Sequence, residues 1–321
     1  MDRPQGPVTG ASREALVATA GESIARGSRS FALASRLFDR TTRERAWLLY
    51  AWCRKCDDLA DGQDHGGDMV AVADPETRLD YISAMTEAAL SGQIAGEPAF
   101  DALGIVVREC AIPHHLPLDH IRGFALDAED WRPRTEQDLL TYCYHVAGVV
   151  GVMMARVMGV DREDTDTLDR AADLGIAFQL ANIARDIEED DRAARCYLPL
   201  DWLVELDIPP GEQMKPQFRP RLAVMAKWLG EMAAEYEASA RSGAMRLPFR
   251  ARWAVLAAAG IYGDIVRTVV ASGDHGWDHR VVTSRRAKLG WVARALAQAL
   301  GKPSRAHSRD GLWTRPKEQP S

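Results

Sequence analysis

Apolar residues recur at every third or fourth position along most of this chain, and this period decides the class of fold that the chain can form. Alternating apolar and polar runs, which would indicate strands, are nearly absent. The segments with a helical period are residues 15–26, 42–59, 75–90, 99–110, 116–126, 136–158, 162–187, 219–240 and 249–271. Because strands are nearly absent, these apolar helix faces must be buried by packing the helices against one another. We therefore predict an all-α fold.

The polar ends of the chain predict the limits of the folded domain. Residues 1–11 are rich in proline and glycine, and the last 21 residues are polar and contain three prolines. A length of 321 residues lies near the upper limit for one hydrophobic core. We expect a flexible N-terminus over residues 1–14, a single domain over 15–300, and a disordered or loosely attached polar tail over 301–321.

Composition excludes some classes of protein. The chain has 40 basic and 46 acidic residues and a net charge of −6, whereas a dedicated nucleic-acid-binding protein usually carries a basic stripe. Five scattered cysteines indicate a reducing compartment rather than a disulfide framework. Cys53 and Cys56 form a C-x-x-C pair without a second pair or a nearby histidine, so we interpret them as core thiols.

No segment is apolar for long enough to be predicted to span a membrane. The longest apolar runs, residues 146–155 and 253–263, are shorter than the roughly 18 residues that a spanning helix needs. The first 11 residues lack the apolar core of a secretory signal. We expect a cytoplasmic protein that is soluble or lies on a membrane surface.

Two acidic clusters lie within apolar helical segments. Asp57 and Asp61 are at positions i and i+4, so they share a helix face about 6 Å apart along the axis. Asn182, Asp186 and Asp190 repeat this spacing in a second segment. Like charges at this spacing destabilise a helix, so a cation should compensate them. Oxygen ligands suit Mg²⁺, and two such faces opposed across a helical bundle would hold Mg²⁺ ions and a diphosphate between them.

Basic and hydroxyl side chains near these clusters suit an anionic substrate. Guanidinium groups bind phosphate oxygens in pairs, and hydroxyls and helix N-termini add further donors. The candidate diphosphate-binding residues are Ser28, Arg29, Arg54, Arg185, Arg195, Tyr197 and Arg285.

Five motifs together resemble those of the squalene/phytoene synthase family. They are residues 28–31 (SRSF), 57–61 (DDLAD), 142–148 (YCYHVAG), 179–190 (QLANIARDIEED) and 195–199 (RCYLP). The resemblance runs from about residue 20 to about 295. It implies a single-domain isoprenoid-synthase helical bundle around a central cavity. It also implies the head-to-head condensation of two geranylgeranyl diphosphates to phytoene through prephytoene diphosphate, with release of two diphosphates.

The resemblance also assigns roles to residues. It implies that the metal ligands are Asp57, Asp61, Asn182, Asp186 and Asp190. It places Asp127, in a Gly-x-x-x-Asp segment, near the second substrate. Two positions depart from the family pattern, because Asp58 stands where many relatives have Glu and Arg29 where many have Lys. The implied cofactor is Mg²⁺, with Mn²⁺ as a substitute and without a requirement for NADPH.

Carbocation chemistry requires a cavity that excludes water. The apolar candidates for its lining are Phe31, Leu33, Val146, Ala147, Val150, Ile176, Leu180 and Ile261. We expect one of Tyr142, Tyr144 and Tyr262 to stabilise a cation with its ring. We assign Tyr142 and Tyr262 to the region of the second substrate. The catalytic set is Asp57, Asp61, Asp186, Asp190 and Tyr144. His145 is interpreted as a buried, hydrogen-bonded residue, and the proton acceptor is released diphosphate or a tyrosine.

The sequence also allows three alternative functions and indicates several binding partners. The alternatives are a squalene or dehydrosqualene synthase that uses farnesyl diphosphate, an all-α Mg²⁺-dependent nucleotide pyrophosphohydrolase, and a non-catalytic helical scaffold. Because the substrate and product are apolar, we expect peripheral contact with a membrane surface, through Trp228, Trp253 or Trp291. Other enzymes of carotenoid biosynthesis are further candidate partners.

Overall fold

The computed structural model describes residues 11–62, 74–302 and 306–316, apart from the side chains of residues 29 and 30. Every regular element in this part of the chain is helical, so the all-α prediction is confirmed. The α-helices are α1 (Arg13–Gly27), α2 (Arg29–Ser35), α3 (Arg40–Asp61), α4 (Pro75–Leu90), α5 (Pro98–Cys110), α6 (His115–Ala128), α7 (Glu136–Cys143), α8 (Val149–Val157), α9 (Thr165–Arg192), α10 (Leu200–Glu205), α11 (Arg219–Ala244), α12 (Phe249–Ser272) and α13 (Arg285–Leu300). The π-helix η1 (Tyr144–Gly148) joins α7 to α8. The 3₁₀ turn η2 (Pro216–Phe218) precedes α11, and the 3₁₀ turn η3 (Gly273–His275) follows α12.

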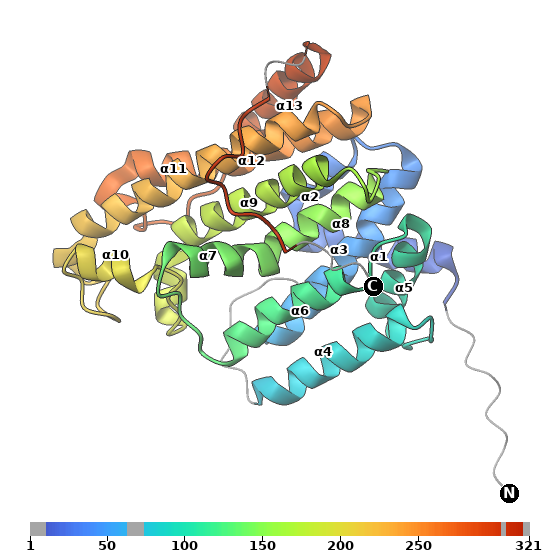
Figure 1. Ribbon diagram of the computed structural model, residues 1–321, viewed down its shortest axis with the longest axis horizontal. Coiled ribbons are helices and arrows are strands. Elements are labelled where there is room, and N and C mark those ends of the chain that lie inside the picture. Colours follow the sequence, from blue (N-terminus) through green and yellow to red (C-terminus); the bar gives the residue numbers. More distant parts are fainter. Residues whose placement is uncertain (1–10, 63–73, 303–305, 317–321) are drawn as a thin grey trace, which may run out of the picture.

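Helix α9 is the central element of the bundle. It packs against α11 and α12 on one side and against η1 and α8 on another. In Figure 1, α11 and α12 run along the upper part of the molecule, α4 and α6 along the lower part, and α9 between them. Helix α3 packs against α1, α4 and α5, and its buried face includes Trp52 and Cys56. This arrangement leaves one face of α3 and one face of α9 on a shared interior.

Each segment with a helical period contains a helix, and the limits differ at the ends. Helix α3 begins at Arg40, two residues before the predicted start, because the Asp39 carboxylate accepts a hydrogen bond from the Thr42 backbone N–H at 3.0 Å and caps it. It ends at Gly62, which has a left-handed φ of 64°. The acidic cluster at Asp57 and Asp61 therefore occupies the last turns of a capped helix.

Glycines allow α8 and α9 to approach closely. A Cβ atom at Gly175 would lie 2.2 Å from the carbonyl oxygen of Ala147, and one at Gly151 would lie 2.1 Å from that of Ala171. Any larger residue would force the two backbones apart. The η1 segment, which contains Ala147, is thereby held directly against α9.

The C-terminal segment differs from the predicted loose tail. Residues 306–316, hereafter the strap, cross the bundle, and Trp313 is buried against Tyr144 with ring centroids 4.9 Å apart. The Trp313 backbone N–H donates to the Tyr236 hydroxyl at 3.0 Å. Figure 1 shows this segment in dark red across the face of the helices. The prediction was wrong for the strap because its anchors are isolated side chains, which leave no periodic pattern.

Two helical stretches in the described residues are long and apolar enough to cross a membrane, namely Glu136–Val157 and Phe249–His275. About half of each stretch is buried inside the bundle, 56% of the first and 50% of the second. Length and composition alone do not separate a spanning helix from a core helix, and these two helices carry core residues such as Met153 and Ile261.

Candidate active site

A cavity of about 970 Å³ lies between α2, α3, α6, η1, α8, α9, α11 and α12. Its wall contains thirteen of the residues predicted to form the site, which come from separate parts of the sequence. They are Ser28, Arg54, Asp57, Asp61, Asp127, Tyr142, Asn182, Arg185, Asp186, Asp190, Arg195, Tyr197 and Tyr262. The two acidic clusters predicted to face one another therefore share one cavity.

Arginines connect the acidic faces of α3 and α9. Arg195, just after α9, donates from Nη1 to Oδ1 of Asp61 at 2.9 Å. Arg185 holds Asp186 through two hydrogen bonds, of 2.6 Å from Nε and 2.5 Å from Nη2. Arg54 Nη1 lies 3.7 Å from Oδ2 of Asp57. Cations and carboxylates thus alternate around this end of the cavity.

Desolvation strongly raises the pKa values of three carboxyl groups in the cavity. It raises the pKa of Asp57 to about 7, although Arg54 opposes the shift. It raises the pKa of Asp190 to about 8, and the charge of Asp186 adds to this. The pKa of Asp127 is raised to about 6, again chiefly by burial. A bound cation would stabilise the charged form of these carboxyl groups and so lower their raised pKa values.

Two tyrosines hold Asp127. The hydroxyl of Tyr197 donates to its Oδ1 at 2.9 Å, and the hydroxyl of Tyr142 lies 3.1 Å from both carboxylate oxygens. The two tyrosine rings stack with centroids 4.8 Å apart, and Trp131 stacks on Tyr142 at 5.6 Å. Asp127 is therefore fixed in place near the acidic end of the cavity.

The apolar part of the cavity extends away from the acidic end. Phe178 and Tyr262 stack on its wall with centroids 4.1 Å apart, and Phe31 stacks on Tyr50 at 5.4 Å. Of the eight apolar residues predicted to line it, five do so: Phe31, Val146, Ala147, Val150 and Ile261. Ile176 and Leu180 are fully buried in the core outside this lining, and Leu33 also lies outside it.

Comparison with known proteins identifies the family. The model of the family "Squalene/phytoene synthase" matches residues 24–289. The chain belongs to the squalene/phytoene synthase family. It is similar to the 15-cis-phytoene synthase of a Paracoccus species, with 46% identity over 94% of this chain and 98% of the relative. It is also similar to the phytoene synthase of Pseudescherichia vulneris, with 43% identity over 95% of this chain and 99% of the relative.

Solved structures show the same fold at lower identity. A dehydrosqualene synthase superimposes with a TM-score of 0.79 at 24% identity, over 89% of this chain and 96% of that chain. A squalene synthase from Alicyclobacillus acidocaldarius superimposes with a TM-score of 0.71 at 21% identity, over 81% of this chain and 95% of that chain. The isoprenoid-synthase helical fold is thus confirmed for this member of the squalene/phytoene synthase family.

Three predicted residues of this squalene/phytoene synthase family member are not brought into the described wall. Tyr144 lies behind it, because its ring packs on Trp313 of the strap. Placing Tyr144 in the catalytic wall was therefore wrong. Arg285 is exposed at the start of α13 and does not line the cavity, and its role in binding diphosphate stays a prediction. The side chain of Arg29 lies outside the described residues.

Sequence reasoning missed Arg280, which takes the position expected for Arg285. Its Nη2 lies 3.1 Å from Oδ1 of Asp186, and its Nε lies 3.2 Å from Oε2 of Glu189. Both Arg280 and Glu189 line the cavity. The signal in the sequence was a basic residue just before the segment 281–286, but a loop has no period that could select it.

His145 is confirmed as a hydrogen-bonded histidine, since its Nδ1 lies 2.9 Å from the carbonyl oxygen of Asp119. Its neighbour on α6, His120, bonds the His145 carbonyl oxygen through Nδ1 at 3.0 Å. Burial lowers the pKa of His120 to about 4, so its ring is neutral at physiological pH.

The oxygen ligands of the cavity suit a divalent cation shared with a substrate. Among the described residues, no three acidic, histidine or cysteine side chains are grouped closely enough to hold a metal by themselves. The partly buried carboxylates with raised pKa values instead lie on α3 and α9, on either side of the cavity. Hard cations bound by one or two carboxylates complete their coordination with water and phosphate oxygens.

Proposed function

We propose that this chain is a phytoene synthase, which joins two geranylgeranyl diphosphates head to head through prephytoene diphosphate and releases two diphosphates. The observation that carries the proposal is one cavity with acidic faces from α3 and α9 at one end and an apolar interior beyond them. Relatives named phytoene synthase, 43–46% identical over nearly the whole chain, support this substrate over farnesyl diphosphate.

The acidic end binds the diphosphates in this proposal. Asp57 and Asp61 on α3, with Asn182, Asp186 and Asp190 on α9, hold Mg²⁺, and Mn²⁺ is expected to replace it. Bound Mg²⁺ supplies Lewis-acid stabilisation of the departing diphosphate. Arg54, Arg185, Arg195 and Arg280 bind phosphate oxygens, and Ser28 adds its hydroxyl. These arginines lie beside the carboxylates that would hold the metal, as their ion pairs show.

The apolar interior protects the reactive cations. Residues such as Val146, Val150 and Ile261 give water no hydrogen-bonding partner, so the cation rearranges instead of forming an alcohol. The stacked rings of Phe178 and Tyr262 offer an aromatic wall that stabilises positive charge. The released diphosphate is the proton acceptor in this proposal, which leaves Asp127 to position the second substrate.

Product analysis tests the proposed function. Purified protein is incubated with Mg²⁺ and labelled farnesyl or geranylgeranyl diphosphate, without NADPH. We expect a C40 hydrocarbon from the C20 substrate, and a C30 product as the main one would contradict the proposal. Release of phosphate from nucleotides would instead support a pyrophosphohydrolase.

A matched pair of substitutions on α9 completes this test. Asp186→Asn is expected to lower kcat by about 100-fold or more, because it removes a charged ligand of the Mg²⁺ that would stabilise the leaving group. Glu188→Gln makes the same change of charge two residues away, at a residue outside the cavity wall, and is expected to keep activity. Equal activity of the two variants would favour a non-catalytic scaffold.

We further propose that the protein contacts membranes through α13. The tryptophans suggested by the sequence are used for packing: Trp228 contacts Trp202, and Trp253 donates to the Val292 carbonyl oxygen at 2.8 Å. By contrast, Leu289 and Leu300 on α13 are 63% and 70% exposed. They are three helical turns apart, so they point to the same side, and Arg285 is close to that side.

Vesicle sedimentation tests the membrane proposal. We expect stronger binding to vesicles of anionic phosphatidylglycerol than to neutral phosphatidylcholine. Replacing both Leu289 and Leu300 with glutamine should weaken binding, whereas Val224→Gln, at an exposed position on α11, should not. Unchanged binding of the double variant would rule out α13 as the contact surface.

A further inference from the structure

A charged residue lies at the apolar inner end of the cavity. Arg170 on α9 is buried and lines this end together with Thr167, Ala171, Ala240, Gly243 and Ala244. It is far from the acidic end, because it comes 12 residues before Asn182 in the same helix. An arginine among alanines and glycine is unexpected in a surface that accepts a hydrocarbon.

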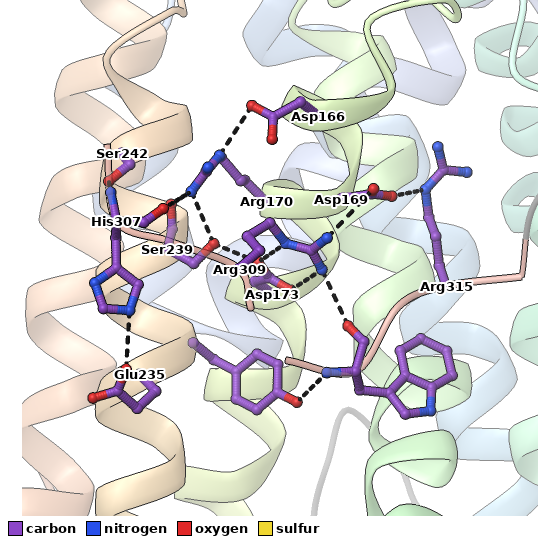
Figure 2. Close-up of polar contacts among 12 residues, drawn as sticks. Asp166, Asp169, Arg170, Asp173, Glu235, Ser239, Ser242, His307, Arg309 and Arg315 are labelled. Carbon is purple, nitrogen blue, oxygen red and sulfur yellow. Dashed lines mark hydrogen bonds and ion pairs between the residues drawn. The ribbon is translucent and has the colours of Figure 1, made fainter. Parts of the chain in front are cut away.

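The guanidinium of Arg170 is bound in the surrounding bundle. Its Nε donates to Oδ2 of Asp166 at 3.1 Å, and its Nη1 donates to the hydroxyl and carbonyl oxygens of Ser239 at 3.2 and 3.3 Å. The same Nη1 donates to the carbonyl oxygen of His307 in the strap at 3.1 Å. Figure 2 shows this guanidinium between α9, α11 and the strap. The hydrogen bonds hold the head of Arg170 in the bundle, and its methylene stem lies between this head and α9.

The stem packs closely against α11. A Cβ atom at Gly243 would lie 2.6 Å from Cβ and 3.1 Å from Cδ of Arg170, so the absence of a side chain at Gly243 gives the stem its place. A long side chain whose charged head is fixed by hydrogen bonds presents its apolar stem as a rigid surface. The stem is thus held in a fixed position beside Gly243 at the inner end of the cavity.

The strap holds this arrangement from outside the helices. Arg309 binds the fully buried Asp173 through two hydrogen bonds, of 2.8 and 2.9 Å, and Arg315 binds Asp169 at 2.6 Å. Asp173 also accepts from the Ser239 hydroxyl at 2.5 Å, and Ser239 is the residue that receives Arg170. Figure 2 shows these contacts as one connected group.

The distance along α9 from the start of the acidic ladder to Arg170 is close to the length of one prenyl chain. Twelve residues of α-helix from Asn182 to Arg170 span about 18 Å. An extended chain advances about 3.3–3.6 Å for three backbone atoms, so this distance holds roughly 16 chain atoms. The main chain of a geranylgeranyl group has sixteen carbons, and that of a farnesyl group has twelve.

We propose that the stem of Arg170, fixed by the strap, is the floor of the cavity and sets the length of the prenyl chain that this enzyme accepts. Arg170 is a specificity-determining residue, and Arg309 and Arg315 are positioning residues that act through it. This inference rests on the proposed function, because it assumes that prenyl diphosphates enter the cavity. A longer chain would have to displace a buried, hydrogen-bonded guanidinium, which is costly.

A competition between substrates of two lengths tests the floor. Equal concentrations of C20 and C25 all-trans prenyl diphosphates are offered, and the ratio of their kcat/KM values is read from the products. This ratio does not depend on the fraction of protein that is folded. Arg170→Ala is expected to raise the C25-to-C20 ratio at least about tenfold, since one excluded methylene is already worth about that factor. The mixed C45 product should appear first, because one of the two chains reaches the floor.

The matched control keeps the bulk of the side chain and removes its charge. Arg170→Met loses the same hydrogen bonds as Arg170→Ala but retains an unbranched stem, so its C25-to-C20 ratio should rise clearly less than that of Arg170→Ala. A rise in Arg170→Met equal to that in Arg170→Ala would overturn the role of the stem. Arg309→Gln should raise the ratio less than Arg170→Ala, whereas Arg40→Gln, at an exposed position far from the floor, should not raise it.

A second variant leaves the charged group intact, in case Arg170→Ala does not fold. Ala244→Val adds two methyl groups to the same end of the cavity and should raise the C15-to-C20 ratio at least about threefold. An unchanged ratio in both Arg170→Ala and Ala244→Val, with a wild type that makes phytoene, would overturn the inference alone. A wild type that makes no phytoene would instead overturn the proposed function.

Discussion

Burial determines the charge state of the acidic residues in the cavity. The pKa values of Asp57 and Asp190, about 7 and 8, lie well above the ordinary value of 3.8. The folded state therefore binds protons more tightly than the unfolded state at these two residues. Their contribution to stability is present below about pH 4 and is lost as the pH rises toward 8. A bound cation would therefore stabilise the folded protein most at pH values near and above 8, where both carboxyl groups are charged.

We accordingly expect the metal-free protein to lose stability between about pH 4 and pH 7 relative to an Asp57→Asn variant, in which that residue does not titrate. Mg²⁺ with diphosphate should raise the melting temperature of the wild type more at pH 8 than at pH 6, because binding releases fewer protons there. Thermal denaturation of both proteins at several pH values measures this. Parallel stability curves of variant and wild type would contradict the assignment.

The sequence could not determine which of two nearby tyrosines faces the cavity. Tyr142 and Tyr144 are two positions apart on a helix, about 200° around its axis, so they cannot both face the cavity. Tyr142 lines it and Tyr144 faces the strap. The motif contained both residues, and the choice between them depended on the packing of a C-terminal segment without a pattern. The ladder of Asn182, Asp186 and Asp190 was decided by its spacing alone, and all three line the cavity.

At the scale of elements, long amphipathic helices were predictable and short or exposed ones were not. Helices α2 and α10 have seven and six residues, too few to establish a period. Helix α13 has 16 residues, but only Ala295 and Ala299 are buried, so its sequence shows no apolar stripe. The segment 136–158 was predicted as one helix. The structure has a π-helix within it, which packs against α9, and no pattern in the sequence predicts this interruption.

The contact between η1 and α9 yields a prediction at this scale. Gly175→Ala would place a Cβ atom 2.2 Å from the Ala147 carbonyl oxygen, so the helices must separate. We expect a loss of about 1–3 kcal/mol of unfolding free energy. Gly290→Ala on α13, where no atom lies within 4 Å, should instead be neutral or stabilising by up to about 1 kcal/mol. Urea denaturation compares the two, and similar values would contradict the close approach.

At the scale of the whole molecule, the strap joins parts that are far apart in the chain. Arg309 lies 136 residues from Asp173, and the Trp313 N–H bonds Tyr236 across 77 residues. Asp173 is fully buried, so its charge depends on Arg309 and Ser239. The strap thus belongs to the folded domain, and a domain limit drawn at residue 300 leaves it outside.

We expect Arg309→Ala to destabilise the protein by about 3–5 kcal/mol, because it leaves the Asp173 carboxylate buried without its main cationic partner. Replacing both Arg309 with Met and Asp173 with Asn should cost less than Arg309→Ala alone, since no charge is then stranded. Chemical denaturation of both variants decides this. A loss below about 1 kcal/mol in Arg309→Ala would mean that the strap is not part of the core.

Helix α9 carries the acidic ladder near one end and the floor near the other, so an unbroken series of backbone hydrogen bonds connects the two. Inserting one residue between Asn182 and Arg170 would turn one of them about 100° around the axis and destroy the site rather than lengthen it. Evolution therefore has little freedom to adjust product size here by insertion or deletion. Relatives with products of other lengths should instead differ by side-chain exchanges around this helix, at constant helix length.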